Sequence, residues 1–171
     1  MPRPPPGWCA GVHRTPPGYL LIATATIRAG QGRLGEFLPQ ARQAFDAYGP
    51  LTEDLLAAAL AAADQLDEAR QVLAQAGPIR TDYFFKVFAT FRAMAMVRLG
   101  EKKGAEELYA SLLPYRDAPP PSSGFTLAIR PVAYTLGELA RLLGRDDEAA
   151  IHFARAATIA ERWNSLWGIT G

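Results

Sequence analysis

From Tyr19 onward, apolar residues recur at helical spacing along most of the chain. Side chains three and four positions apart share one face of an α-helix, so this pattern predicts amphipathic helices. The clearest stripes are Phe84, Phe88, Phe91 and Ala95; Ala105, Leu108 and Leu112; Val132, Leu136, Leu139 and Leu143; and Ala149, Phe153, Ala156, Ala160 and Trp163. No stretch after Tyr19 sustains the apolar–polar alternation of a half-buried strand. The pattern therefore predicts an all-α fold.

Short turns containing a glycine or an aspartate separate these stripes. Gly144 follows one stripe, at a place where glycine adopts the left-handed backbone of a helix end without strain. Asp146 is then expected to cap the next helix. Gly100 occupies the corresponding turn upstream, and Asp64 replaces the glycine in the turn before that. The turns therefore predict where the helices end.

Aligning these turns gives a repeating unit. Ala69, Ala105 and Ala149 become equivalent, at intervals of 36 and 44 residues. A unit of about 34 residues or slightly more, made of two antiparallel helices, is typical of helical repeats. The longer interval contains a loop at 116–128, whose prolines and serines cannot continue a helix. We therefore expect an α-solenoid of about four antiparallel helix pairs.

The N-terminal segment 1–17 differs from the rest of the chain. It contains six prolines and no continuous apolar core, so it is predicted to be a flexible leader and not a signal peptide. Residues 18–171 then form a single helical-repeat domain. The single cysteine, Cys9, excludes an internal disulfide and fits a reducing cytoplasm. No apolar run approaches the roughly 18 residues of a membrane span, so we expect a cytoplasmic protein.

The charges of the chain nearly balance. Eighteen basic and seventeen acidic residues give a net charge of +1. Direct binding to nucleic acid or to an anionic membrane depends on an excess of positive charge. Neither partner is therefore expected.

A literal G-x-G-x-x-G occupies 30–35, after an apolar run that begins at Leu20. In a dinucleotide-binding fold, this motif directly follows a strand, and an acidic residue lies about 20 positions further on. Asp54 lies nineteen residues past Gly35, near that place. However, nothing after Phe37 indicates a second parallel strand. We interpret the glycines as a turn between two helices.

Other chemical motifs are weak. Cys9 and His13 have metal-like spacing, but two ligands in a proline-rich leader make no site. His152 has no neighbouring histidine or cysteine in the sequence and is interpreted as structural. The acidic run 146–148 is explained by the positive end of a helix. We expect no metal, no cofactor and no enzymatic activity, although a site assembled from distant residues stays open at this stage.

The turns resemble the tetratricopeptide pattern. Its small, turn, small, large and small positions are matched by Gly137, Gly144, Ala149, Phe153 and Ala156. The order of the segments "GRLGEFLPQA", "LDEARQVL", "AEELYASLLPYRD", "RPVAYTLGELARLLGRDDEAAIHFARA" and "AERW" is similar to the C-terminal repeat region of LuxR-type or adenylate-cyclase-like signalling ATPase regulators of bacteria. The resemblance covers about residues 28–167.

In such regulators this region follows a nucleotide-hydrolysing module and often precedes a DNA-binding domain, and neither is present here. The resemblance therefore implies a protein–protein interaction or sensor module of a transcriptional regulator. Two alternatives are a free-standing tetratricopeptide adaptor or scaffold and a truncated fragment with no independent activity.

Stacked helix pairs bind peptides or partner domains on a concave face lined by the first helix of each pair. The repeat pattern places six candidates on this face: Asp54, Thr90, Arg98, Tyr134, Glu138 and Arg141. An ordinary solvated helix face is the alternative for each of them. Trp163 and Trp167 lie close to the C-terminus without a polar helix to cover them, so this edge is expected to self-associate as a homodimer or to belong to a longer regulator.

Overall fold

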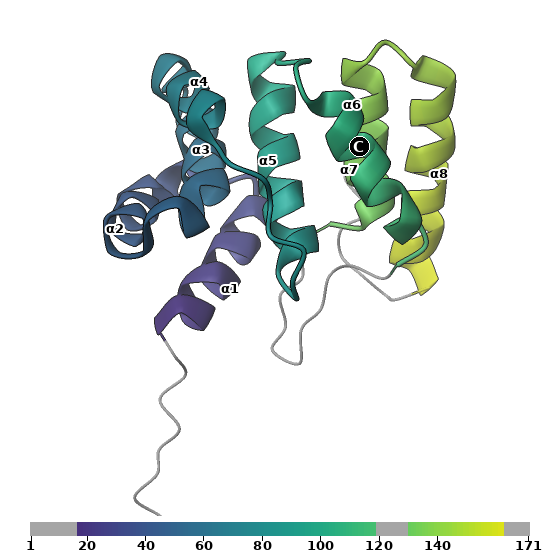
Figure 1. Cartoon of the computed structure of the whole chain (residues 1–171). Helices are drawn as coiled ribbons and strands as arrows, with labels where there is room; N and C mark the ends of the chain where they lie inside the picture. The colour runs from purple at the N-terminus through teal and green to yellow at the C-terminus, as the bar shows by residue number, and fades with distance from the viewer. Residues whose placement is uncertain (1–16, 119–129, 163–171) are drawn as a thin grey trace, which may run out of the picture.

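The computed structural model describes residues 17–118 and 130–162. Within these ranges the chain forms helices and turns, with no strand (Figure 1). The prediction of an all-α fold is therefore confirmed for the described residues. Residues 1–16, most of the expected loop at 116–128, and both Trp163 and Trp167 lie outside them. None of the helices in these two ranges has the length and apolar character required to cross a membrane.

The α-helices follow one another with short connections. In chain order they are α1 (Pro17–Gly30), α2 (Leu38–Tyr48), α3 (Glu53–Ala62), α4 (Leu66–Gln75), α5 (Phe85–Leu99), α6 (Ala105–Leu112), α7 (Val132–Leu142) and α8 (Asp146–Arg162). Short 3-10 helices occur at η1 (Leu34–Phe37), η2 (Gly49–Thr52) and η3 (Leu113–Tyr115).

Three of the turns have the backbone that the sequence predicts. Asp64, Gly100 and Gly144 follow α3, α5 and α7, and their φ angles are 60°, 67° and 81°. This left-handed conformation is strained for most residues, but glycine adopts it freely and aspartate tolerates it. Asp146 is the first residue of α8, so it lies in the first turn and not at the expected cap position. Its carboxylate still lies at the positive end of the helix.

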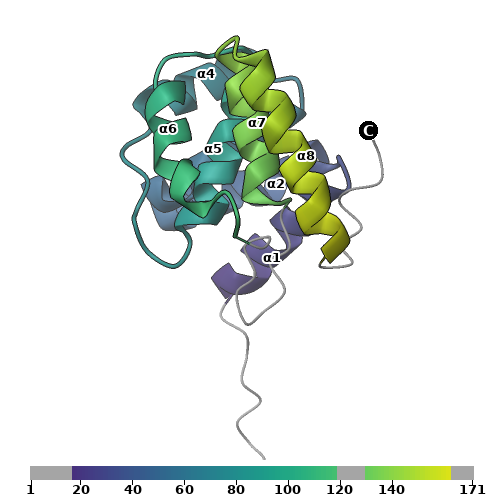
Figure 2. The same cartoon turned by 90° about the vertical axis from the view of Figure 1, so that its right-hand side faces the viewer.

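The helices pack in a fixed order around α3, α5 and α7. α5 contacts both α3 and α7, while α4 packs on α3, α6 on α5 and α7, and α8 on α7 (Figures 1 and 2). One part of the core joins η1, α3 and α5 through Leu34, Leu60 and Phe91, and a second joins α6 and α7 through Leu112 and Leu136. The buried core therefore consists of successive clusters along the row of helices.

α3 is the central helix of the first core cluster. All of its residues from Asp54 to Ala61 are buried, and most of them are alanine or leucine. A helix that is apolar on all sides has to be surrounded by other helices. At the other end of the row, α7 packs tightly on α8 at Gly137. A Cβ added to this glycine would lie only 2.7 Å from Cε1 of Phe153 in α8.

Candidate functional site

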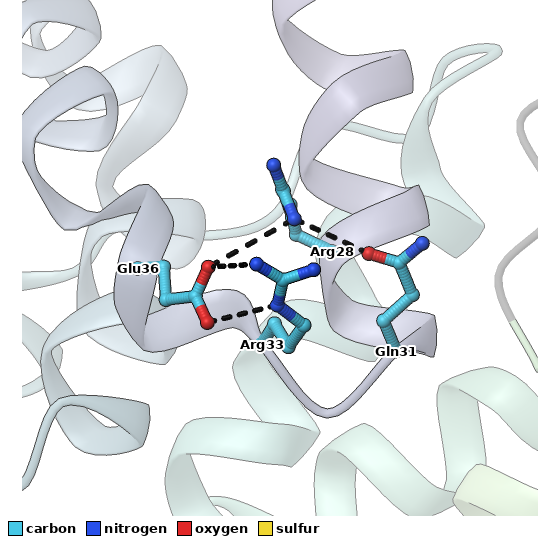
Figure 3. A network of polar contacts seen from close by, with 4 residues as sticks. All are labelled: Arg28, Gln31, Arg33 and Glu36. Atoms are coloured by element: carbon cyan, nitrogen blue, oxygen red, sulfur yellow. Dashed lines mark hydrogen bonds and ion pairs between the residues drawn. The ribbon is translucent and has the colours of Figure 1, made fainter.

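The glycine-rich segment 30–35 is a turn between two helices with its own polar network. Figure 3 shows that Arg33 Nε and Nη2 donate to the two carboxylate oxygens of Glu36, at 2.8 and 2.7 Å. Arg28 Nη1 donates to Gln31 Oε1 at 3.4 Å and lies 3.8 Å from the Glu36 carboxylate. The Arg33 hydrogen bond lowers the pKa of Glu36. The polar side chains of this turn are therefore bonded to one another.

At two positions of this segment, the backbone conformation or the packing requires a glycine. Gly32 has a φ of 68°, in the left-handed region. A Cβ on Gly35 would lie 2.7 Å from the carbonyl oxygen of Ala62. The element before the motif is helix α1, whereas a dinucleotide fingerprint follows a strand. The interpretation of this motif as a turn between helices is confirmed.

Two of the six candidates for the groove, Asp54 and Thr90, are buried. Thr90 has no exposed surface, and its hydroxyl donates to the carbonyl of Lys86 at 2.7 Å. Asp54 is 5% exposed and accepts a hydrogen bond from Arg92 Nε at 2.5 Å. Neither side chain is available to touch a partner. Both are therefore removed from the expected binding surface, because neighbouring helices cover the face on which they lie.

Asp54 instead belongs to a charged cluster that joins three segments. Arg92 Nη2 lies 3.7 Å from Glu53 Oε1 and is buried without a hydrogen-bond partner. The Glu53 carboxylate also accepts the backbone N–H of Gly77 at 2.8 Å. Burial raises the pKa of Asp54 to about 6, although the Arg92 hydrogen bond and charge oppose this rise. The cluster ties α3, α5 and the connection after α4 together.

Arg98 and Glu138 line a shallow groove between α3, α5 and α7. Its volume is about 230 Å³, and it is lined by Ala58, Ala61, Ala62, Met94, Val97, Arg98, Arg130 and Glu138. Arg98 is largely exposed, with its Nη2 2.5 Å from Asp64 Oδ1. Glu138 pairs with Arg130 at 2.6 Å. The structure thus brings two of the six candidates into one groove.

Tyr134 and Arg141 do not line this groove, and both pack against Phe153. The guanidinium of Arg141 lies 4.8 Å from the centre of the Phe153 ring, and the Tyr134 ring lies 5.2 Å from it. Arg130 lies over the Tyr134 ring at 4.9 Å and thereby connects it to Glu138. The three candidates of α7 therefore form one continuous surface. Arg130 was not among the residues expected from the sequence, although its spacing of four residues from Tyr134 could have indicated it.

A larger cleft, which the sequence analysis also missed, lies between α4, α5 and α6. Its volume is about 630 Å³, and the 76–84 connection forms one wall. The lining residues are Arg70, Leu73, Ala74, Ala76, Ile79, Thr81, Phe85, Arg92, Met96, Glu101, Lys103, Gly104, Glu107, Leu108 and Ser111. The length of the connection between α4 and α5 was the feature of the sequence that could have indicated this cleft. The turns that follow α3, α5 and α7 are shorter.

His152 has a structural environment between α6 and α8. Its Nε2 lies 2.8 Å from the hydroxyl oxygen of Tyr109, and this hydroxyl donates its one proton to Glu148 at 3.0 Å. Burial lowers the pKa of His152, and the nearby charge of Arg155 lowers it further. Within 17–118 and 130–162, no group of three histidine, cysteine, aspartate or glutamate residues could hold a metal ion. Cys9 and His13 lie outside these ranges.

Comparison of the chain with protein-family models, with curated proteins and with solved structures finds no match. The assignment of function therefore rests on the geometry of the chain itself.

Proposed function

We propose that this chain is a protein–protein interaction module built as a tetratricopeptide-like solenoid. In this arrangement α1 and α2, α3 and α4, α5 and α6, and α7 and α8 form four antiparallel pairs. The equivalent alanines Ala69, Ala105 and Ala149 support this arrangement, because each is buried near the start of the second helix of a pair. The contacts from α3 to α5 to α7 also support it, since first helices of successive repeats stack in this way.

The groove between α3, α5 and α7 is the proposed binding surface. Its volume of about 230 Å³ is below the roughly 300–1,000 Å³ of small-molecule sites. It therefore suits inserted side chains of a partner more than a whole small ligand. Alanines from α3 leave room for an extended backbone to approach the groove.

The exposed guanidinium of Arg98 is the main support for this proposal. Its side chain is 58% exposed, and among the described residues its ion-pair partner is the exposed Asp64. A surface ion pair contributes little free energy, so a partner can displace Asp64 at small cost. The planar guanidinium then binds a carboxylate through two parallel hydrogen bonds. We therefore propose that the partner is an extended protein segment that carries an aspartate or glutamate.

The order of segments favours an interaction or sensor module of a cytoplasmic bacterial transcriptional regulator. The second candidate, a free-standing adaptor, uses the same groove and differs only in its context. Identifying the full coding frame, with or without a DNA-binding domain, would distinguish these two.

The binding proposal can be tested with a random library of displayed peptides selected on the purified chain. We expect acidic peptides to be enriched. Their affinity should fall at least about tenfold in Arg98→Ala, the loss expected for one charge-assisted contact. Arg80→Ala is the matched control, since this arginine is 61% exposed, pairs with Asp82 and lies outside the groove.

Selection of no peptide, or of peptides that bind Arg98→Ala as well as the original chain, would rule out this groove. Tyr134 and Arg141 are less suitable for the test, because they cover Phe153 and their removal disturbs the packing of α7 on α8.

A further inference from the structure

The cleft between α4, α5 and α6 is separate from the proposed peptide groove. Figure 1 shows α5 between α4 and α6, with the connection after α4 descending beside it. None of the residues that line the cleft lines the groove, although α5 contributes to both. Its volume of about 630 Å³ lies within the roughly 300–1,000 Å³ of small-molecule sites. The cleft is thus large enough to enclose a ligand.

Apolar side chains from every wall face this cleft. They are Leu73 from α4, Ile79 from the connection, Phe85 and Met96 from α5, and Leu108 from α6. Such walls bury the hydrocarbon or aromatic part of a ligand. An apolar body alone, however, does not specify how a ligand is oriented.

Some charged residues of the cleft already have hydrogen-bond or ion-pair partners within the chain. Arg70 pairs with Asp67 at 2.9 Å, and Arg92 bonds to Asp54. The carboxylate of Glu101 accepts a backbone N–H. Each of these three side chains therefore has a local partner, although Nη2 of Arg92 is buried without a hydrogen bond.

Two opposite charges in the cleft are unengaged. Among the described residues, neither the ammonium group of Lys103 nor the carboxylate of Glu107 has a hydrogen-bond or ion-pair partner. Lys103 precedes α6 and Glu107 lies in its first turn, so both charges lie at the same end of the cleft. A ligand that satisfies both must carry one negative and one positive group.

We propose that this cleft binds a small zwitterion with an apolar body, namely a short apolar peptide with free ends. The terminal carboxylate pairs with Lys103 and the terminal ammonium with Glu107, while the side chains occupy the apolar walls. An internal segment of a protein lacks charged ends and does not satisfy these two residues. This ligand class therefore distinguishes the cleft from the groove between α3, α5 and α7.

The test uses a pool of tripeptides made from leucine, isoleucine, valine, phenylalanine and methionine. The full chain is incubated with the free-ended pool or with the same pool acetylated and amidated. Peptides that co-elute with the protein are identified by mass spectrometry, and their affinity is measured by calorimetry. We expect retention from the free-ended pool and at least about tenfold weaker binding of the blocked peptides.

Variants assign each end of the peptide. Lys103→Ala should weaken binding about tenfold and remove the preference for a free carboxylate over an amide. Glu107→Ala should also weaken binding about tenfold, and it should remove the preference for a free amine over an acetylated one. The exposed Lys102 does not line the cleft, so Lys102→Ala is the matched control and should leave affinity unchanged.

A filling variant tests the location of the site independently of charge. Ala74→Trp places a large ring in the cleft and should abolish retention, whereas Ala110→Trp, on an exposed position outside it, should not. Circular dichroism checks that each variant is folded. Absence of retained peptides, equal binding of the blocked pool, or unchanged binding by Ala74→Trp would each overturn the proposal. None of these results bears on acidic peptides in the groove.

Discussion

Replacing Asp54 by asparagine tests whether burial or ion pairing dominates the charged cluster between α3 and α5. Asp54 has a pKa of about 6 in the folded chain against an ordinary value of 3.8, because desolvation outweighs the attraction of Arg92. A group whose pKa is raised on folding stabilises the folded state in its protonated form. This stabilisation is complete below about pH 3.8 and is lost as the pH rises through about 6.

The size of the effect follows from the two pKa values. A rise of about 2 units corresponds to about 3 kcal/mol of folding free energy, since one unit is about 1.4 kcal/mol. Integration over pH places about 2 kcal/mol of this loss between pH 4 and pH 7.5. Asparagine does not titrate, so Asp54→Asn should gain about 2 kcal/mol relative to the original chain over the same range. The variant also leaves Arg92 without its charged partner, but this cost does not change across these pH values.

The assay is urea denaturation followed by far-UV circular dichroism at several pH values from 4 to 7.5. The quantity compared is the difference in unfolding free energy between Asp54→Asn and the original chain. Asp67→Asn is the control, because this carboxylate is 96% exposed and its difference should stay nearly constant. A pH-independent difference for Asp54→Asn would refute the reasoning. A variant that becomes relatively less stable as the pH rises would show that Arg92 outweighs burial.

The remaining predictions concern packing and are checked by the same denaturation at pH 7. Gly35→Ala should destabilise the chain by about 1–3 kcal/mol, because its Cβ would meet the backbone of Ala62, which cannot move aside easily. Gly137→Ala should cost less, about 1 kcal/mol, since the Phe153 ring can shift and alanine gains helix propensity; equal losses at both glycines would contradict this explanation. Leu136→Ala should cost about 2–5 kcal/mol because the side chain is fully buried, and a loss below about 1 kcal/mol would show that the core collapses around the cavity.

The sequence by itself determined the features that depend on nearby residues. Stripes of apolar residues predict α5 to α8 because the periodicity of a helix acts within a few turns. The turn at Asp64 could be aligned with those at Gly100 and Gly144 because each ends a helix in the left-handed conformation. Gly137 could be matched to Phe153 through the tetratricopeptide pattern, and the structure places these two residues in contact.

Only the tertiary structure decided which helix faces are covered and where space remains. The phase of a helix gives the direction of a side chain from its own axis, but it does not say whether another helix lies there. Asp54 and Thr90 were therefore expected at the surface and are buried. The pairing of Asp54 with Arg92 joins residues 38 positions apart, a contact that no local pattern specifies. The cleft lined by Lys103 likewise depends on how α4, α5 and α6 are spaced by the packing of the whole chain.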